Sequence, residues 1–277
     1  MRLIVACEVD PASVNIRTAL LGMTPWREVG RLGPSPVFEH GELTLLTLSE
    51  EHLYLDGVTA LLPQVSVLDD HPPGGIGRPE AVIYASRHRS AAGRKALTVH
   101  PIGNFAAADF GGRPGQLPPS APALQSALLR ALREAATGLP REVSFECTHH
   151  GPWLDTPACY IEVGSDESGW QDADAAAAVA RAILTARQEP RPVAVGFGGG
   201  HYVPRFTDLA VKGRYDFGHM AASWALEAVG PRAVDMAMAA TPGATHAVFQ
   251  TRSAEREATA DVLARARDRG LVVVQAD

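Results

Sequence analysis

Short apolar segments typical of buried β-strands alternate with helix-like segments along most of the chain, and this order limits the folds it can adopt. The expected strands cover residues 3–9, 42–48, 81–86, 142–148, 159–163, 193–197, 246–250 and 271–275. The expected helices cover residues 11–21, 120–138, 172–187, 219–229, 231–240 and 254–269. Because parallel strands need crossover connections, usually helices, this order predicts an α/β fold with a mixed, largely parallel sheet and helices on both faces. No repeat or linker-like segment interrupts the pattern, so we expect a single domain over residues 1–277.

Charge and cysteine content exclude several classes of protein. The chain has 277 residues and a formal net charge of -6, so it lacks the global basic field of many nucleic-acid-binding domains. Its three cysteines show no CxxC spacing, which argues against a thiolate zinc ribbon or a disulfide framework. No apolar run approaches the roughly 20 residues of a membrane-spanning helix. We therefore expect a cytoplasmic protein without membrane contact, by default a monomer with no protein partner.

A glycine-rich segment follows the expected strand at 193–197 and is the clearest candidate for a functional loop. Glycines occupy positions 198–200, directly before His201 and Tyr202, and Arg205 follows. Consecutive glycines after a strand indicate tight turning or close approach of the backbone to a ligand. A loose turn with a surface histidine explains this segment equally well when it is taken alone.

Several histidines share a position relative to the expected strands. Five of the ten lie at strand ends or just beyond them: His88, His100, His149, His150 and His201. A sixth, His219, lies at the expected start of a helix. Each taken singly is more often a structural hydrogen-bonding group. Because ligands bind outside the carboxyl ends of strands in open α/β sheets, we nevertheless expect these histidines to meet in one crevice.

The segment Glu-Cys-Thr-His-His-Gly-Pro at 146–152 holds the densest set of reactive groups. If the chain stays extended there, Glu146, Thr148 and His150 point to one face and His149 to the other. A carboxylate beside an imidazole can orient the ring or raise its basicity toward water, and the same groups can bind zinc. The chain has no HExxH motif, so zinc binding is indicated here by the residue types alone.

Two charged stretches complete the candidates. Glu162 lies within an expected strand and is the best site candidate of an acidic region. The most basic stretch runs from Arg87 to Lys95, and charge runs of this kind are usually solvated loops. If it is functional, a phosphate backbone would bind there, with a second edge formed by Arg205, Lys212 and Arg214.

Taken together, these motifs resemble those of the archaeal and plant-type D-aminoacyl-tRNA deacylases, nearly from end to end. The resemblance rests on Ser86-Arg87-His88, Thr98 with His100, Gly103-Asn104, Thr148 to Pro152, Glu162 with Gly164-Ser165, Gly198 to Tyr202, and Gly218-His219. Several ordered motifs at matching spacing are a far more specific signal than any one of them.

The resemblance implies hydrolysis of the ester that joins a D-amino acid to the 3′-terminal adenosine of tRNA. It also implies a phosphorylase/hydrolase-like α/β fold similar to bacterial peptidyl-tRNA hydrolase, and zinc (Zn²⁺) dependence. Plant members are linked, in addition, to removal of aldehyde-modified D-aminoacyl groups. The expected partner is therefore tRNA charged with a D-amino acid.

The residues and the resemblance together lead to the following assignments. As catalytic residues we expect Glu146, His150 and His201. As substrate-binding residues we expect Ser86, Arg87, His88, Thr98, Asn104, Thr148, Gly199, Gly200, Tyr202 and Arg205. As zinc-ligand candidates we expect His100, His149, Glu162 and His219.

The reaction can be outlined from the residue types, although other activities remain open. No GxSxG elbow is present, so we favour direct attack of water, with backbone amides at 198–200 stabilising the oxyanion. One alternative is a zinc-dependent amidase or peptidase that uses the same histidines without nucleic acid. Another is a non-catalytic protein that binds nucleotides or tRNA ends, in which the histidines only pack and stack.

Overall fold

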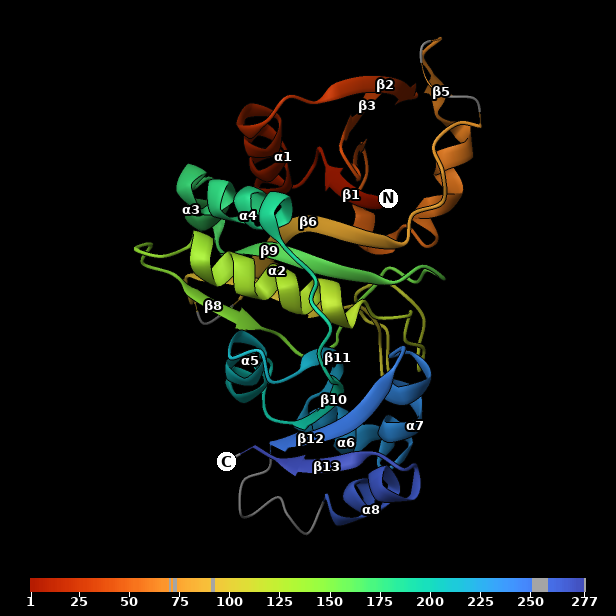
Figure 1. Cartoon of the computed structure of the whole chain (residues 1–277), viewed down its shortest axis with the longest axis vertical. Helices are drawn as coiled ribbons and strands as arrows, with labels where there is room; N and C mark the ends of the chain where they lie inside the picture. The colour runs from red at the N-terminus through yellow and green to blue at the C-terminus, as the bar shows by residue number, and fades with distance from the viewer. Residues whose placement is uncertain (70, 72–73, 91–92, 251–258, 277) are drawn as a thin grey trace.

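The computed structural model describes residues 1–69, 71, 74–90, 93–250 and 259–276, and their strands form two sheets (Figure 1). The larger sheet has the strand order β5-β2-β3-β4-β1-β6-β9-β7-β8. These strands are β1 (Arg2–Cys7), β2 (Arg27–Leu32), β3 (Ser35–His40), β4 (Leu43–Leu48), β5 (Ser66–Val67), β6 (Ala81–Arg89), β7 (Ala96–Pro101), β8 (Glu142–Phe145) and β9 (Ala158–Ser165).

Parallel pairing dominates the centre of the larger sheet, and antiparallel pairing its β2–β3 side. Strand β1 runs parallel to β4 and β6, β6 parallel to β9, and β7 parallel to β8. Strands β7 and β9 are antiparallel, as are β2, β3, β4 and β5 where they pair. The predicted mixed, largely parallel α/β architecture is confirmed.

The smaller sheet is entirely parallel, with the order β11-β10-β12-β13. Its strands are β10 (Val193–Gly198), β11 (Asp216–Ala221), β12 (Ala244–Gln250) and β13 (Val272–Gln275). The predicted helix at 219–229 is therefore wrong in its first part, because His219 lies within β11. Every residue of β11 is buried, so this strand lacks the polar–apolar alternation that would have identified it.

The α-helices are α1 (Pro11–Met23), α2 (Pro122–Ala135), α3 (Glu167–Trp170), α4 (Ala173–Thr185), α5 (Pro204–Val211), α6 (Ser223–Val229), α7 (Arg232–Ala239) and α8 (Ala260–Asp268). Two 3₁₀ helices, η1 (His52–Tyr54) and η2 (Val58–Gln64), follow β4. The Asp10 side chain caps α1 by accepting from the amide of Ser13, and Pro11 occupies the first helical position. Part of the predicted helix at 254–269 lies outside the described residues, and α8 forms the remainder. No helix among the described residues is long and apolar enough to cross a membrane.

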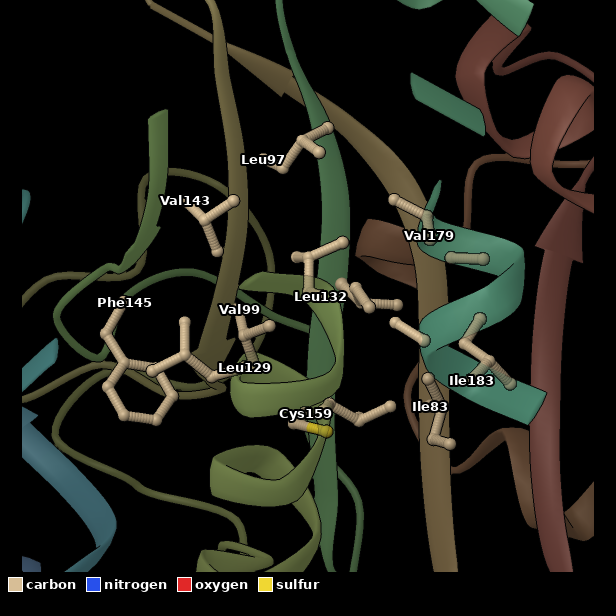
Figure 2. Close-up of a cluster of buried hydrophobic side chains, with 14 of the residues drawn as sticks. Ile83, Leu97, Val99, Leu129, Leu132, Val143, Phe145, Cys159, Val179 and Ile183 are labelled. Atoms are coloured by element: carbon tan, nitrogen blue, oxygen red, sulfur yellow. The ribbon is translucent and has the colours of Figure 1, made fainter. Parts of the chain in front are cut away.

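Helix α2 lies between the two sheets and contributes to the main core (Figure 1). Figure 2 shows Leu129 and Leu132 of α2 packed among apolar side chains of β6, β7 and β9, with Ile183 of α4 beside them. Helices α1, α2 and α4 thus cover one face of the larger sheet, and η2 packs on the other. The smaller sheet has α2 and α5 on one face and α6, α7 and α8 on the other. Helices on both faces are therefore a property of the smaller sheet.

Candidate functional site

Polar side chains from three neighbouring strands form the floor of a site on the face of the larger sheet that α1, α2 and α4 leave free. Glu162 of β9 lies opposite Ser86 of β6 and Thr98 of β7. Two residues further along the β7–β9 pair, Tyr160 lies opposite His100. Alternate residues of a strand share a face, so this register places all five side chains together. The predicted location outside the strand ends is corrected: much of the site lies on the sheet face itself.

Glu146 is the centre of the site and is completely buried. Its two oxygens lie 3.1 Å from Nδ1 of His88 and 3.2 Å from Nε2 of His201. A third contact, 3.6 Å long, joins it to Nε2 of His149. Neither carboxylate oxygen has a partner with hydrogen-bond geometry among the described residues. The positive charge of neighbouring groups therefore stabilises this buried carboxylate, and its oxygens can still accept a hydrogen bond or bind an ion.

Backbone contacts bring Glu146 and His201 together from the two sheets. Glu146 follows β8 and forms an isolated antiparallel bridge with Tyr202, which follows β10. The amide of Cys147 donates to the carbonyl oxygen of His201 at 2.9 Å. The glycine-rich segment that was predicted to be functional therefore places His201 beside the carboxylate of Glu146.

The surrounding histidines determine the charge of Glu146. Burial alone would raise the pKa of this carboxyl group. The close contact with His201 and the positive charges of His88 and His100 outweigh burial, and the pKa lies below its usual value. The fold therefore keeps Glu146 ionised in the interior, where an isolated carboxylate would be costly.

Three histidine rings meet beside Glu146. The centroids of His100 and His149 lie 4.2 Å apart, and those of His149 and His150 lie 4.3 Å apart. The prediction that His149 points away from Glu146 is wrong, because the chain bends at Thr148 and the extended alternation ends there. His150 has φ 46°, in the left-handed region that few non-glycine residues adopt, and such backbone strain is concentrated at functional sites.

Each of these three rings has Nδ1 close to a backbone carbonyl oxygen. The partners are the carbonyls of Pro101 for His100 (3.1 Å), Cys147 for His149 (2.8 Å) and Gly151 for His150 (2.8 Å). This arrangement assigns a proton to Nδ1 and leaves the lone pair on Nε2, as in histidines that bind metals. Burial, followed by the charge of His100, holds the pKa of both His149 and His150 well below its usual value, so their rings are neutral.

The donor set fits zinc. One ligand atom from each of His100, His149 and His150 lies within 4.8 Å of the others, and Nε2 of His100 is buried with no hydrogen-bond partner in the described part of the chain. Three imidazoles that bind through deprotonated Nε2 atoms, with an open fourth position, are a common catalytic zinc site. Glu162 lies 3.5 Å from Nε2 of His100 and accepts from Thr98, so it can act as a ligand or orient one.

The floor opens into a cavity of about 520 Å³ that reaches from the histidines to η1 and to Phe110. Its lining comprises Glu51, His52, Leu53, Tyr54, Ser86, Arg87, His88, Arg89, Phe110, His149, His150, Tyr160, Glu162 and His201. Two of the predicted catalytic residues, His150 and His201, therefore share one cavity, with Glu146 directly behind them.

Other predicted residues lie at the cavity wall or behind it, where they contact protein groups. Nε2 of His88 lies 2.8 Å from the hydroxyl of Tyr202, so both nitrogens of His88 contact protein groups. The hydroxyl of Thr98 donates to Glu162. Asn104 donates to the carbonyl of Gly111, which positions a loop.

The structure does not bring the remaining predicted residues into the cavity lining. His219 lies between the hydroxyl of Thr148 and the carbonyl of Pro118, so both of its ring nitrogens have protein partners. Burial lowers the pKa of His219 to about 4. Gly199 packs beside Gln250, Gly200 is exposed, and Arg205 is exposed on α5. These residues were expected at the site from their positions in the sequence motifs. In the structure they lie outside the cavity, in contact with other parts of the protein or with solvent.

Several residues in or below the cavity wall were not expected from the sequence. Asp10 is buried below the floor, where it accepts from the hydroxyl of Ser86 and the amide of Arg87. Tyr160 stacks on His100 with ring centroids 5.0 Å apart. Glu51 pairs with Arg87 at 2.9 Å. Nothing local marks Tyr160 or Glu51, because their roles arise from strand pairing and from the return of η1 across the sheet.

Known proteins are similar to this chain in sequence and in fold. A family model described as D-aminoacyl-tRNA deacylase matches residues 77–274. A relative of that name from Methanococcoides burtonii is 39% identical over 236 residues, which cover 83% of this chain and 47% of the relative. The corresponding protein of Thermoplasma acidophilum is 34% identical over 244 residues, covering 88% of this chain and 87% of the relative. The chain thus spans about half the length of the first and most of the second.

A solved structure agrees with the sequence relatives. The crystal structure of a conserved protein of unknown function, AF0625, superposes with a TM-score of 0.85 and 31% identity. That superposition covers 100% of this chain and 95% of the other. The extent of the family match and the identities to its relatives show that this chain belongs to the D-aminoacyl-tRNA deacylase family.

Proposed function

We propose that this protein hydrolyses the ester bond of D-aminoacyl-tRNA, releasing the free D-amino acid and tRNA. The observation that carries the proposal is the ionised Glu146 held between His88 and His201 at the wall of a cavity, in a chain of this family. A cavity of about 520 Å³ has the size of ordinary small-molecule pockets, so it suits the terminal aminoacyl-adenosine, with the tRNA body outside. The reaction takes place where charged tRNA is used, in the cytoplasm.

His201 is the group we expect to take the proton from the attacking water. Its Nε2 faces Glu146, which leaves Nδ1 to accept that proton. The neighbouring carboxylate orients the ring and stabilises the imidazolium that forms. His201 is also the partly exposed member of the pair, so water and ester can reach it.

His88 is a positioning residue in this account. Its Nε2 lies 2.8 Å from the Tyr202 hydroxyl, and its Nδ1 lies 3.1 Å from Glu146. The Trp170 indole nitrogen also donates to the backbone carbonyl of His88. These contacts fix the ring, and the ring in turn fixes the carboxylate that serves His201.

Zinc would be held by His100, His149 and His150, with Glu162 adjacent. When bound, it would polarise an oxygen ligand and lower the pKa of water. In the protein itself, the three Nδ1 contacts to backbone carbonyls orient the rings and leave Nε2 as the ligand atom of each. The carboxylates of Glu146 and Glu162 supply the compensating negative charge.

The decisive experiment compares hydrolysis of D-tyrosyl-tRNA by the wild type and by Glu146→Gln. The substitution keeps the side-chain volume and removes the charge, so we expect a folded protein whose kcat/KM falls about a hundredfold or more. Full activity in the variant would remove Glu146 from the mechanism. Hydrolysis of amino-acid amides with no dependence on tRNA would favour an amidase instead.

A further inference from the structure

Two large aromatic side chains at the cavity wall are left in solvent by the fold. Phe110 is 64% exposed and Tyr54 is 63% exposed, the highest fractions among the large hydrophobic residues that the structure describes. Both line the catalytic cavity. An aromatic ring can bury about 150–250 Å² of surface, so exposed rings at this place indicate a surface that a ligand covers.

Close backbone packing brings the segments that carry the two rings together. Gly111 has φ 73°, and a Cβ atom there would collide with the carbonyl oxygen of Leu53 and lie 3.3 Å from the Tyr54 ring. A residue without a side chain is therefore needed for the loop carrying Phe110 to approach η1. The amide group of Asn104 donates to the carbonyl of Gly111 at 3.0 Å and holds the loop from the other side.

The same loop is joined directly to the segment that carries the histidines. The amide of Gly151 donates to the carbonyl of Phe110 at 2.9 Å, and His150 is the residue before it. The amide of Trp153 in turn donates to Asp56, which follows η1. The backbone segments that carry the two aromatic residues are thus anchored to the segment that carries the reacting groups.

The direction of the substrate decides what these rings meet. In a charged tRNA the amino acid is the terminal group, and the adenosine connects it to the rest of the molecule. The amino acid can therefore be enclosed, whereas the adenosine must lie nearer the mouth through which the tRNA leaves. Aromatic rings are the platforms on which proteins stack unpaired bases, because every base has a flat π face.

We propose that Tyr54 and Phe110 form a stacking platform for the adenine of the terminal nucleotide, so that the cavity recognises the nucleoside as well as the amino acid. This inference rests on the proposed function and adds to it a nucleobase subsite. Glu51 and Arg87 pair at 2.9 Å and line the same cavity as this platform and the histidines.

The test uses adenosine 5′-monophosphate as a probe that needs no turnover. Its binding to wild type, Tyr54→Ala and Phe110→Ala is measured by ligand-observed NMR, and as competitive inhibition of D-tyrosyl-tRNA hydrolysis. We expect saturable binding to the wild type and about a tenfold or greater loss in each alanine variant, the usual scale of a lost base-stacking contact. Phe110→Tyr should restore binding. Leu68→Ala, which removes an exposed apolar side chain outside the cavity, is the matched control.

A second measurement separates the nucleobase from the amino acid side chain. The same variants are assayed with D-tyrosyl-adenosine and with D-tyrosine methyl ester, which lacks the base. KM should rise about tenfold for the adenosine ester and stay unchanged for the methyl ester. Equal loss with both esters would assign the platform to the amino acid side chain, and absence of nucleotide binding by the wild type would overturn the inference. Nucleotide binding without any deacylation would instead remove the proposed function and retain the subsite.

Discussion

Oε2 of Glu146 lies 3.2 Å from Nε2 of His201, although Glu146 follows a strand of the larger sheet and His201 a strand of the smaller one. The site thus lies where the two sheets meet. The backbone bridge between Glu146 and Tyr202 holds the segments that carry Glu146 and His201 together. Because the carboxylate is buried and the imidazole is partly exposed, the pair places a stabilised base at a surface that substrate can reach.

We predict that His201→Ala leaves the protein folded and lowers kcat/KM for D-aminoacyl-tRNA about a hundredfold or more. This is the scale of a lost general base, and a partly exposed ring contributes little to the core. Circular dichroism and steady-state deacylation measure the two properties. His246→Ala is the control, because that histidine lies in β12 outside the cavity lining and should be dispensable. A folded His201→Ala enzyme with wild-type rates would contradict the assignment.

Metal content provides a second test. We predict that the purified protein contains zinc, that chelation lowers deacylation, and that His150→Ala reduces the zinc bound per chain by removing one of three imidazole ligands. Inductively coupled plasma mass spectrometry and deacylation before and after zinc is returned provide the readouts. The His246→Ala control should keep its zinc. A His150→Ala protein with undiminished metal would place the ion elsewhere.

Stability should depend on pH through His219. The buried ring has a pKa of about 4, against about 6.5 in the unfolded chain. Above pH 6.5 the ring is neutral in both states. As the pH falls from 6.5 to 4 only the unfolded chain gains the proton, so the free energy of unfolding decreases, by about 3 kcal/mol at about 1.36 kcal/mol per pH unit.

Urea unfolding at pH 7.5 and pH 4.5 measures this effect. The decrease between the two pH values should be smaller in His219→Gln than in the wild type, whatever stability the variant has at pH 7.5. An identical decrease in both proteins would show that His219 is not the group that titrates. Because His52, whose pKa burial also lowers to about 4, is present in both proteins, its contribution cancels.

Arg89 should contribute to tRNA binding through phosphate. The side chain is exposed at the cavity wall, with its guanidinium 5.4 Å from the centroid of the Trp170 ring. Arg89→Ala should raise the KM for D-aminoacyl-tRNA. It should also reduce the slope of log KM against log salt concentration by about 1, the amount expected for one lost phosphate contact. Arg267→Ala, on the exposed side of α8, should leave both unchanged. If the two variants show the same salt slope as the wild type, the tRNA backbone does not reach Arg89.

The sequence was sufficient to predict most strands, several helices and the α/β class, because these depend on local periodicity and caps. The start of α1 at Asp10-Pro11 is an example. It was insufficient to predict the division into two sheets, because which strands pair is decided by contacts far apart in the chain. The β2–β3 hairpin was missed, since its strands carry charged residues at half-exposed positions and weak alternation.

The sequence was a better guide to which residues form the site than to how their side chains are oriented. Glu146, His150 and His201 were expected together, and the structure places them together. The orientation of His149 was wrong, because a bend at Thr148 cannot be read from the spacing of side chains. His219 was expected among the metal ligands, but the pairing of β11 with β10 turns it toward Thr148 and Pro118.

The central claim is best tested by presenting one enzyme preparation with matched D- and L-tyrosyl-tRNA and measuring the rate at which each loses its amino acid. We predict rapid hydrolysis of the D-ester, little hydrolysis of the L-ester above the spontaneous rate, and loss of the D-specific activity in Glu146→Gln. Equal rates on both esters, or a D-specific rate that survives in Glu146→Gln, would contradict it.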